Sequence, residues 1–245
     1  MKRLLPYLVA PIVLTTPSFA QVAQLPDLLN QNDPATTAKI IQYFLLLTVL
    51  SLAPSILVMV TSFTRIIVAF SFLRSAIGMQ STPANIVVTS LALFLTFFVM
   101  APTFDKSWKE GLQPMIENKI TQEEAFGKIV GPFQVFMMAQ VREKDLTMFR
   151  NLAAERFGDN GAGEVNDLRT LVPAFMISEL RRGFEIGFLI ALPFLIIDLI
   201  VATITMSMGM MMMPPSVIAL PFKVLFFVLI DGWGMLAGSL VKSFS

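Results

Sequence analysis

The chain has 245 residues and a formal net charge of +1; 55% of its residues are hydrophobic and 14% are charged, against about 25% charged residues in soluble domains. This composition indicates an integral membrane protein or a core component of a helical membrane complex, and no basic or phosphate-binding motif supports a nucleic-acid partner. Cysteine and histidine are absent, which excludes disulfides, Ser–His–Asp and Cys–His catalysis, and zinc or haem ligation through those residues; we predict no enzyme, metal site or cofactor.

Residues 1–20 have the pattern of a cleavable signal peptide. Two basic residues at 2–3 precede a short apolar run at 4–14, and residues 18–20 have the small-x-small pattern of a cleavage site. The apolar run is too short to span a bilayer, so we favour cleavage over an uncleaved first membrane helix. Residues 21–39 then form the mature N-terminal segment, which begins outside the inner membrane of a bacterium.

Long apolar stretches with few charges follow. Because about 20 apolar residues cross a bilayer, they predict an all-α fold with about four spanning-length helical segments. The last two are divided near Pro214 and Pro215, since proline stops a helix. We expect a first apolar helical hairpin over 40–104 and a second over 184–245 that contains a methionine-rich turn. The apolar stretches are 40–64, 75–104, 184–222 and 224–241.

Most charged residues lie between the two hairpins, in residues 105–183. Thr121 and Glu124 form a capping-box pattern ahead of an apolar run with helical spacing, so this region reads as a water-exposed helical insertion. The signal peptide places the mature N-terminus outside, and Arg65 and Arg74 then lie near the inner connection, as the positive-inside rule favours. The insertion is therefore predicted to be periplasmic.

Several ionisable residues interrupt the apolar stretches, where an Arg, Lys or Asp costs roughly 2.5–3.5 kcal/mol at a helix centre on insertion scales. One hypothesis is a proton or ion pathway that uses Asp198 and Asp231, as in a transporter or channel. The other is structural pairing between helices or subunits, which we favour because no transporter-like pair of half-helix ends is visible. The candidates for such pairing are Arg65, Glu179, Asp198, Lys223 and Asp231.

Six of the eight residues from Met206 to Met213 are methionine, and Pro214 and Pro215 follow. Methionine is flexible and polarizable, so such a run can close around an object and repack when its shape changes. A deformable apolar collar is one interpretation. A methionine-rich helix end packed in a core is the other, and on these residues alone it is the more common case.

Motifs across the mature chain resemble the signature of the FliP family. They are 54–68 (PSILVMVTSFTRIIV), 92–96 (ALFLT), 172–175 (VPAF), 177–180 (ISEL), 194–202 (FLIIDLIVA), 209–215 (GMMMMPP), 220–223 (LPFK) and 229–233 (LIDGW). The resemblance implies a pore-forming subunit of the flagellar type III protein export gate, which conducts unfolded flagellar subunits across the inner membrane. It implies five copies of the chain assembled with FliR, FliQ and FlhB into a helical cone in the flagellar basal body, with FlhA nearby. Much of that cone faces the periplasm.

The resemblance also gives the methionine run a role. It implies that Met210, Met211 and Met212 form a gasket that seals the channel, and Met213 is a further candidate for the seal. Met206 and Met208 are candidates for the approach to the pore. A proton-coupled transporter or ion channel using Asp198 and Asp231 remains the alternative.

Overall fold

The computed structural model describes residues 34–79, 82–158, 167–209 and 213–244. The chain divides into two compact units, Met1–Ala53 and Pro54–Ser245. Within the first unit the structure describes the start of one helix, α2, and the second unit holds all the other elements. The predicted signal peptide and most of the predicted segment 21–39 lie outside the described residues.

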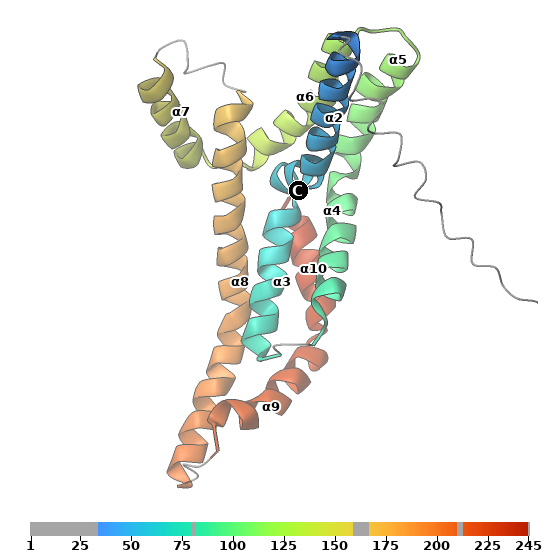
Figure 1. The fold of residues 1–245 in the computed structure, drawn as a ribbon. Helices are drawn as coiled ribbons and strands as arrows, with labels where there is room; N and C mark the ends of the chain where they lie inside the picture. The colour runs from blue at the N-terminus through green and yellow to red at the C-terminus, as the bar shows by residue number, and fades with distance from the viewer. Residues whose placement is uncertain (1–33, 80–81, 159–166, 210–212, 245) are drawn as a thin grey trace, which may run out of the picture. The chain divides into compact units, whose positions relative to one another are not determined.

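The described residues form helices joined by short connections and contain no strand, so the predicted all-α class is confirmed (Figure 1). The elements are α2 (Pro34–Met59), α3 (Phe63–Ile77), α4 (Asn85–Ser107), a π-helical turn (Trp108–Leu112), α5 (Gln113–Ile116), α6 (Gln122–Gln140), α7 (Glu143–Phe157), α8 (Leu168–Ser207), α9 (Pro215–Leu229) and α10 (Gly232–Lys242).

Three helical stretches in the described part of the chain are long and apolar enough to cross a membrane: Lys39–Met59, Asn85–Ile116 and Leu168–Ser207. Helices α9 and α10 are bent by 62° at the break between them, and together they supply a fourth candidate span. The prediction of about four long apolar segments is therefore confirmed.

The stretch 40–104 contains three helices instead of the two expected for a hairpin, because residues 60–62 separate α2 from α3. Threonine hydroxyls form hydrogen bonds with backbone groups at this break. The Thr61 hydroxyl accepts a hydrogen bond from the Phe63 N–H at 3.4 Å, and the Thr64 hydroxyl donates one to the Val58 carbonyl at 3.3 Å. Threonine competes with the helical ladder in this way. Hydropathy does not register such a break, since the flanking residues are apolar.

The predicted insertion 105–183 has no structural boundary at either end. Helix α4 continues through residue 105 into the π-helical turn, and α8 runs for 40 residues across the expected boundary at 183–184. A helix propagates through backbone hydrogen bonds, which a change from polar to apolar side chains does not interrupt. Residues 105–183 comprise the end of α4, the π-helical turn, α5, α6, α7 and the start of α8.

Helix α6 begins with the capping box that its sequence predicts. The Glu124 N–H donates to the Thr121 hydroxyl, and the Glu124 carboxylate accepts from the Thr121 N–H, both at 3.3 Å. Helices α6, α7 and the start of α8 share a small core of Met137, Leu146, Leu171, Ala174 and Phe175.

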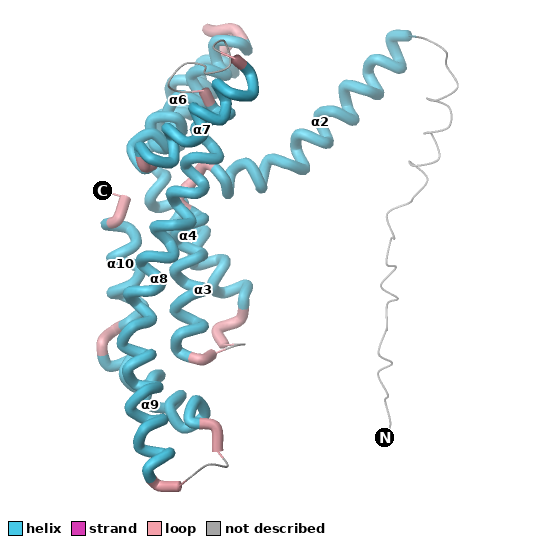
Figure 2. The backbone as a smooth tube through the Cα atoms, turned by 90° about the vertical axis from the view of Figure 1, so that its left-hand side faces the viewer, coloured by secondary structure: helices cyan, strands magenta, loops and turns pink. Residues whose placement is uncertain are grey.

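The main core joins α3, α4, α8, α9 and α10. Helix α3 lies beside α8 (Figures 1 and 2), and two glycines of α8 allow the close approach. A Cβ added to Gly183 would lie 3.0 Å from Val68, and one added to Gly187 would lie 2.6 Å from Phe72. The buried members of the main core are Ile66, Ala69, Phe70, Leu73, Ile77, Val88, Ala92, Phe194, Phe227, Leu236 and Leu240.

Candidate functional site at the buried charges and the methionine-rich turn

Arg65 and Glu179 form a fully buried ion pair between α3 and α8. Their side chains are 1% and 0% exposed. The Arg65 Nε donates to Glu179 Oε2 at 2.9 Å, and Nη2 donates to Oε1, so the pairing is bidentate. Planar guanidinium and carboxylate groups bond best in this arrangement, which leaves neither charge unpaired inside the protein.

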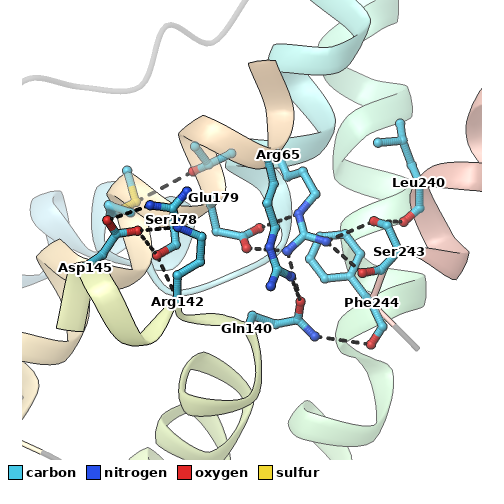
Figure 3. A network of polar contacts seen from close by, with 12 residues as sticks. Arg65, Gln140, Arg142, Asp145, Ser178, Glu179, Leu240, Ser243 and Phe244 are labelled. Carbon is cyan, nitrogen blue, oxygen red and sulfur yellow. Dashed lines mark hydrogen bonds and ion pairs between the residues drawn. The ribbon is translucent and has the colours of Figure 1, made fainter. Parts of the chain in front are cut away.

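The rest of the Arg65 guanidinium binds the C-terminal end of the chain and the end of α6 (Figure 3). Nη1 donates to the Ser243 carbonyl and hydroxyl, each at 2.9 Å, and Nη2 donates to Gln140 Oε1 at 2.9 Å. The guanidinium carbon lies 3.7 Å from the centre of the Phe244 ring, in cation–π geometry. Arg65 therefore ties three helices to the last residues of the chain.

A second polar cluster lies next to this one, between α7 and α8 (Figure 3). Arg142 pairs with both carboxylate oxygens of Asp145 at 3.0 Å, and the Ser178 hydroxyl lies 2.7 Å from Asp145 Oδ2. Burial acts to raise the pKa of Asp145, but the hydrogen bonds from Ser178 and Arg142 and the positive charges of Arg142 and Arg181 outweigh it. The pKa of Asp145 therefore lies below its ordinary value.

Lys223 and Asp198 join α9 to α8. The Lys223 ammonium donates to Asp198 Oδ2, and at 3.0 Å to the backbone carbonyl of Ala76 in the last turn of α3. The Lys223 side chain is 6% exposed and that of Asp198 is 35% exposed. One ammonium group thus connects α9 to two other helices, α8 and α3.

Of the five charged residues singled out in the sequence, the structure brings together Arg65 with Glu179 and Asp198 with Lys223. Asp231 belongs to neither pair. It is an exposed residue that precedes α10, with a φ of 50° in the left-handed region.

The methionine-rich turn connects α8, which ends at Ser207, to α9, which begins at Pro215. Met210, Met211 and Met212 lie outside the described residues. The flanking methionines Met206, Met208 and Met213 are exposed to 64%, 68% and 48% and are not packed in the core of this chain.

Sequence reasoning missed Gln140 and Ser243 as partners of Arg65. Gln140 follows Phe133, Phe136 and Met137 at helical spacing on α6, so a polar residue that continues an apolar face was a usable signal. Nothing in the sequence points to the Ser243 carbonyl, because every residue carries a backbone carbonyl. Among the described residues, no cluster of three or more Asp or Glu side chains could hold a metal ion.

The sequence profile of the FliP family matches residues 46–240. The chain is 58% identical over 236 residues to the flagellar biosynthetic protein FliP of Agrobacterium fabrum (strain C58 / ATCC 33970), covering 96% of each chain. It is 49% identical over 218 residues to the FliP of Bacillus subtilis (strain 168), with 89% of this chain and 98% of the relative covered. It is 44% identical over 224 residues to the FliP of Aquifex aeolicus (strain VF5), with 91% and 93% covered. The chain belongs to the FliP family.

Proposed function

We propose that this chain is a pore-forming subunit of the flagellar type III protein export gate, which conducts unfolded flagellar subunits across the inner membrane for flagellum assembly. Membership of the FliP family supports the flagellar role, since the relatives compared above are named flagellar biosynthetic proteins. The proposal assigns no catalytic step to the chain.

The observation that carries the proposal is the chemistry of the exposed face of α8. Phe188, Leu189 and Leu199 are exposed to 55%, 64% and 68%. The ion pair between Arg181 and Glu185, each 57% exposed, lies on the same helix. Lipid would cover the apolar residues but not the charges, which are expensive in a bilayer. A helix face that carries both apolar and charged side chains is suited to contact with neighbouring proteins and with a water-filled channel.

We assign that face to neighbouring subunits of the gate. The neighbours are further copies of this chain, five in all, together with FliR, FliQ and FlhB, and FlhA lies nearby in the basal body. In this arrangement residues 105–183 face the periplasm, and the apolar helices lie in the inner membrane or against other subunits.

The methionine-rich turn serves as the seal in this proposal. Met210, Met211, Met212 and Met213 from several copies would meet around the channel, and Met206 and Met208 would line its approach. Soft apolar side chains can form a dry constriction that parts for a polypeptide of any sequence. Support comes from the flanking methionines, which are exposed instead of packed within the chain.

A transporter or channel based on Asp198 and Asp231 is the less favoured alternative. A relay needs groups that exchange a proton along one path, whereas Asp198 is paired with Lys223, and Asp231 stands apart from that pair at the start of α10. Transport that titrates with pH and disappears in Asp198→Asn and Asp231→Asn variants, with export unchanged, would favour the alternative.

The test is a variant that carries Met210→Ala, Met211→Ala and Met212→Ala together, produced in cells that make the other gate components. We expect the complex to assemble at normal yield while the inner membrane becomes permeable to small ions. The control replaces Met148 and Met235, exposed methionines outside the turn, by alanine. In cells that make this control the inner membrane should stay impermeable to small ions. A tight membrane in the triple variant contradicts the gasket.

A further inference from the structure

The main core stops well short of the connection between α8 and α9. Its last buried members there are Phe194 on α8 and Phe227 on α9. From Phe194 to Ser207, α8 extends another 13 residues, or about 20 Å at 1.5 Å per residue. The ends of both helices therefore project beyond the main core (Figure 2).

The projecting ends leave space between them. A cavity of about 450 Å³ opens between them, lined by apolar side chains that include Ile200, Ile204 and Phe222. Protein interiors that fix a geometry by packing leave few voids larger than a water molecule. Thr205 on α8 and Ala219 on α9 are buried near these ends, but apolar packing leaves the space between the helices unfilled, so a polar contact between them adds to what sets their separation.

The contact between Lys223 and Asp198 lies between the main core and this cavity. The pair is nine residues from the end of α8 and eight from the start of α9. The two helical segments between the pair and the turn, residues 198–207 and 215–223, are called the arms, and each is about 12–14 Å long. Asp198 Oδ1 has no hydrogen-bond partner among the described residues, so within them the carboxylate is held by Lys223 through Oδ2.

The same ammonium anchors the two arms to α3. The last carbonyls of a helix lack intrahelical partners. In α3 the Arg74 and Ser75 carbonyls accept bonds from the N–H groups of Met79 and Gly78, and the Ala76 carbonyl accepts from Lys223. Because α3 belongs to the main core, Lys223 adds a polar contact between that core and the parts of α8 and α9 next to the cavity.

We propose that Lys223 is a positioning residue that fixes the separation of the α8 and α9 ends, and through them the alignment of the methionine seal. The effect on the seal rests on the function proposed above, but the effect on the helix ends does not. Loss of the ammonium group frees both arms, so the separation of the ends becomes variable.

The absence of cysteine allows a direct test on the intact export complex. Ser207→Cys and Ser216→Cys, at exposed positions on the two ends, carry spin labels, and labelled chain is diluted with unlabelled chain so that distances within one copy dominate. Electron–electron resonance then gives the distribution of the label separation. We expect a narrow distribution in the parent, a broader one in Lys223→Met, and partial recovery in Lys223→Arg.

The matched control is Lys119→Met, since Lys119 is also ion-paired, with Glu117, but is exposed and remote in sequence from the turn. It should leave the distribution unchanged. If Lys223→Met yields no complex, Lys223→Gln replaces it, because a shorter, neutral side chain cannot form the ion pair with Asp198.

Ion leakage measured on the same variants separates the two proposals. A broader distribution with increased leakage supports both. A broader distribution with a tight membrane supports the role of Lys223 at the helix ends and overturns its effect on the methionine seal, which the alanine variant of the turn tests separately. An unchanged distribution in the variant that lacks the ion pair overturns the role of Lys223, whatever the leakage.

Discussion

Replacing Glu179 by glutamine removes the charge that balances Arg65 and keeps the shape of the side chain. Removing one partner of a buried ion pair costs about 3–5 kcal/mol, because the other charge stays buried and unpaired. Arg65 retains Gln140, the Ser243 carbonyl and the Phe244 ring. We therefore expect Glu179→Gln to lower the free energy of unfolding by about 3 kcal/mol, the lower end of this range.

The control is Glu185→Gln on the same helix. Glu185 pairs with Arg181 in an exposed i,i+4 arrangement, and such pairs contribute about 0–1 kcal/mol. For a chain of this size, 1 kcal/mol shifts Tm by about 2–4 °C. Glu179→Gln should therefore lower Tm by about 6–12 °C, and Glu185→Gln by less than about 4 °C.

Tryptophan fluorescence during thermal unfolding of the purified chain measures this difference. The Trp233 ring packs on Phe227 and Phe70, with centroids 5.3 and 6.1 Å away, so its emission reports on the main core. A Trp108→Phe background removes the other tryptophan of the chain. Equal Tm values for Glu179→Gln and Glu185→Gln would refute the reasoning that burial makes the Arg65 pair important.

Four further variants test the packing, the helix cap and the acid response. Gly187→Leu forces side-chain atoms into α3, where a Cβ would already lie 2.6 Å from Phe72, and should destabilise the chain by about 1–3 kcal/mol in chemical unfolding. Gly127→Ala, which has open space around its Cβ, should instead stabilise the chain by about 0.5–1 kcal/mol. Thr121→Ala removes the α6 cap and should cost about 0.5–2 kcal/mol, with faster hydrogen exchange confined to the first turn of α6; uniform exchange across α6 would contradict a local cap. The pKa of Asp145 is lowered in the folded chain, so the ionised side chain stabilises the fold above about pH 4, the pKa in the unfolded chain, and this stabilisation is lost as pH falls through the folded pKa. The Asp145→Asn variant should therefore be less stable than the parent at neutral pH and should lose less stability on acidification. Parallel curves of stability against pH for the two proteins would contradict this.

The sequence predicts the helical class and the number of long apolar segments because both depend on composition and local pattern. The α6 cap follows from two side chains, Thr121 and Glu124, three positions apart. The start of α9 follows from the proline pair at 214–215, since proline suits the first position of a helix. Each of these features is decided by neighbours along the chain.

Three other features were not predictable in the same way. The charged residues could be singled out, but not paired, since Arg65 and Glu179 are 114 positions apart. The break before α3 depends on how the Thr61 and Thr64 hydroxyls bond to the backbone. The uninterrupted course of α8 is missed because a change in composition suggests a boundary that the backbone does not have.

Electron microscopy of the complex, purified with the neighbouring gate subunits from membranes, tests the central claim most directly. The account predicts several copies of this chain around one axis, with residues 209–213 of each copy meeting at that axis and closing it. Copies whose α8–α9 turns point outward into lipid, or a single copy bound at the edge of the complex, would contradict the account.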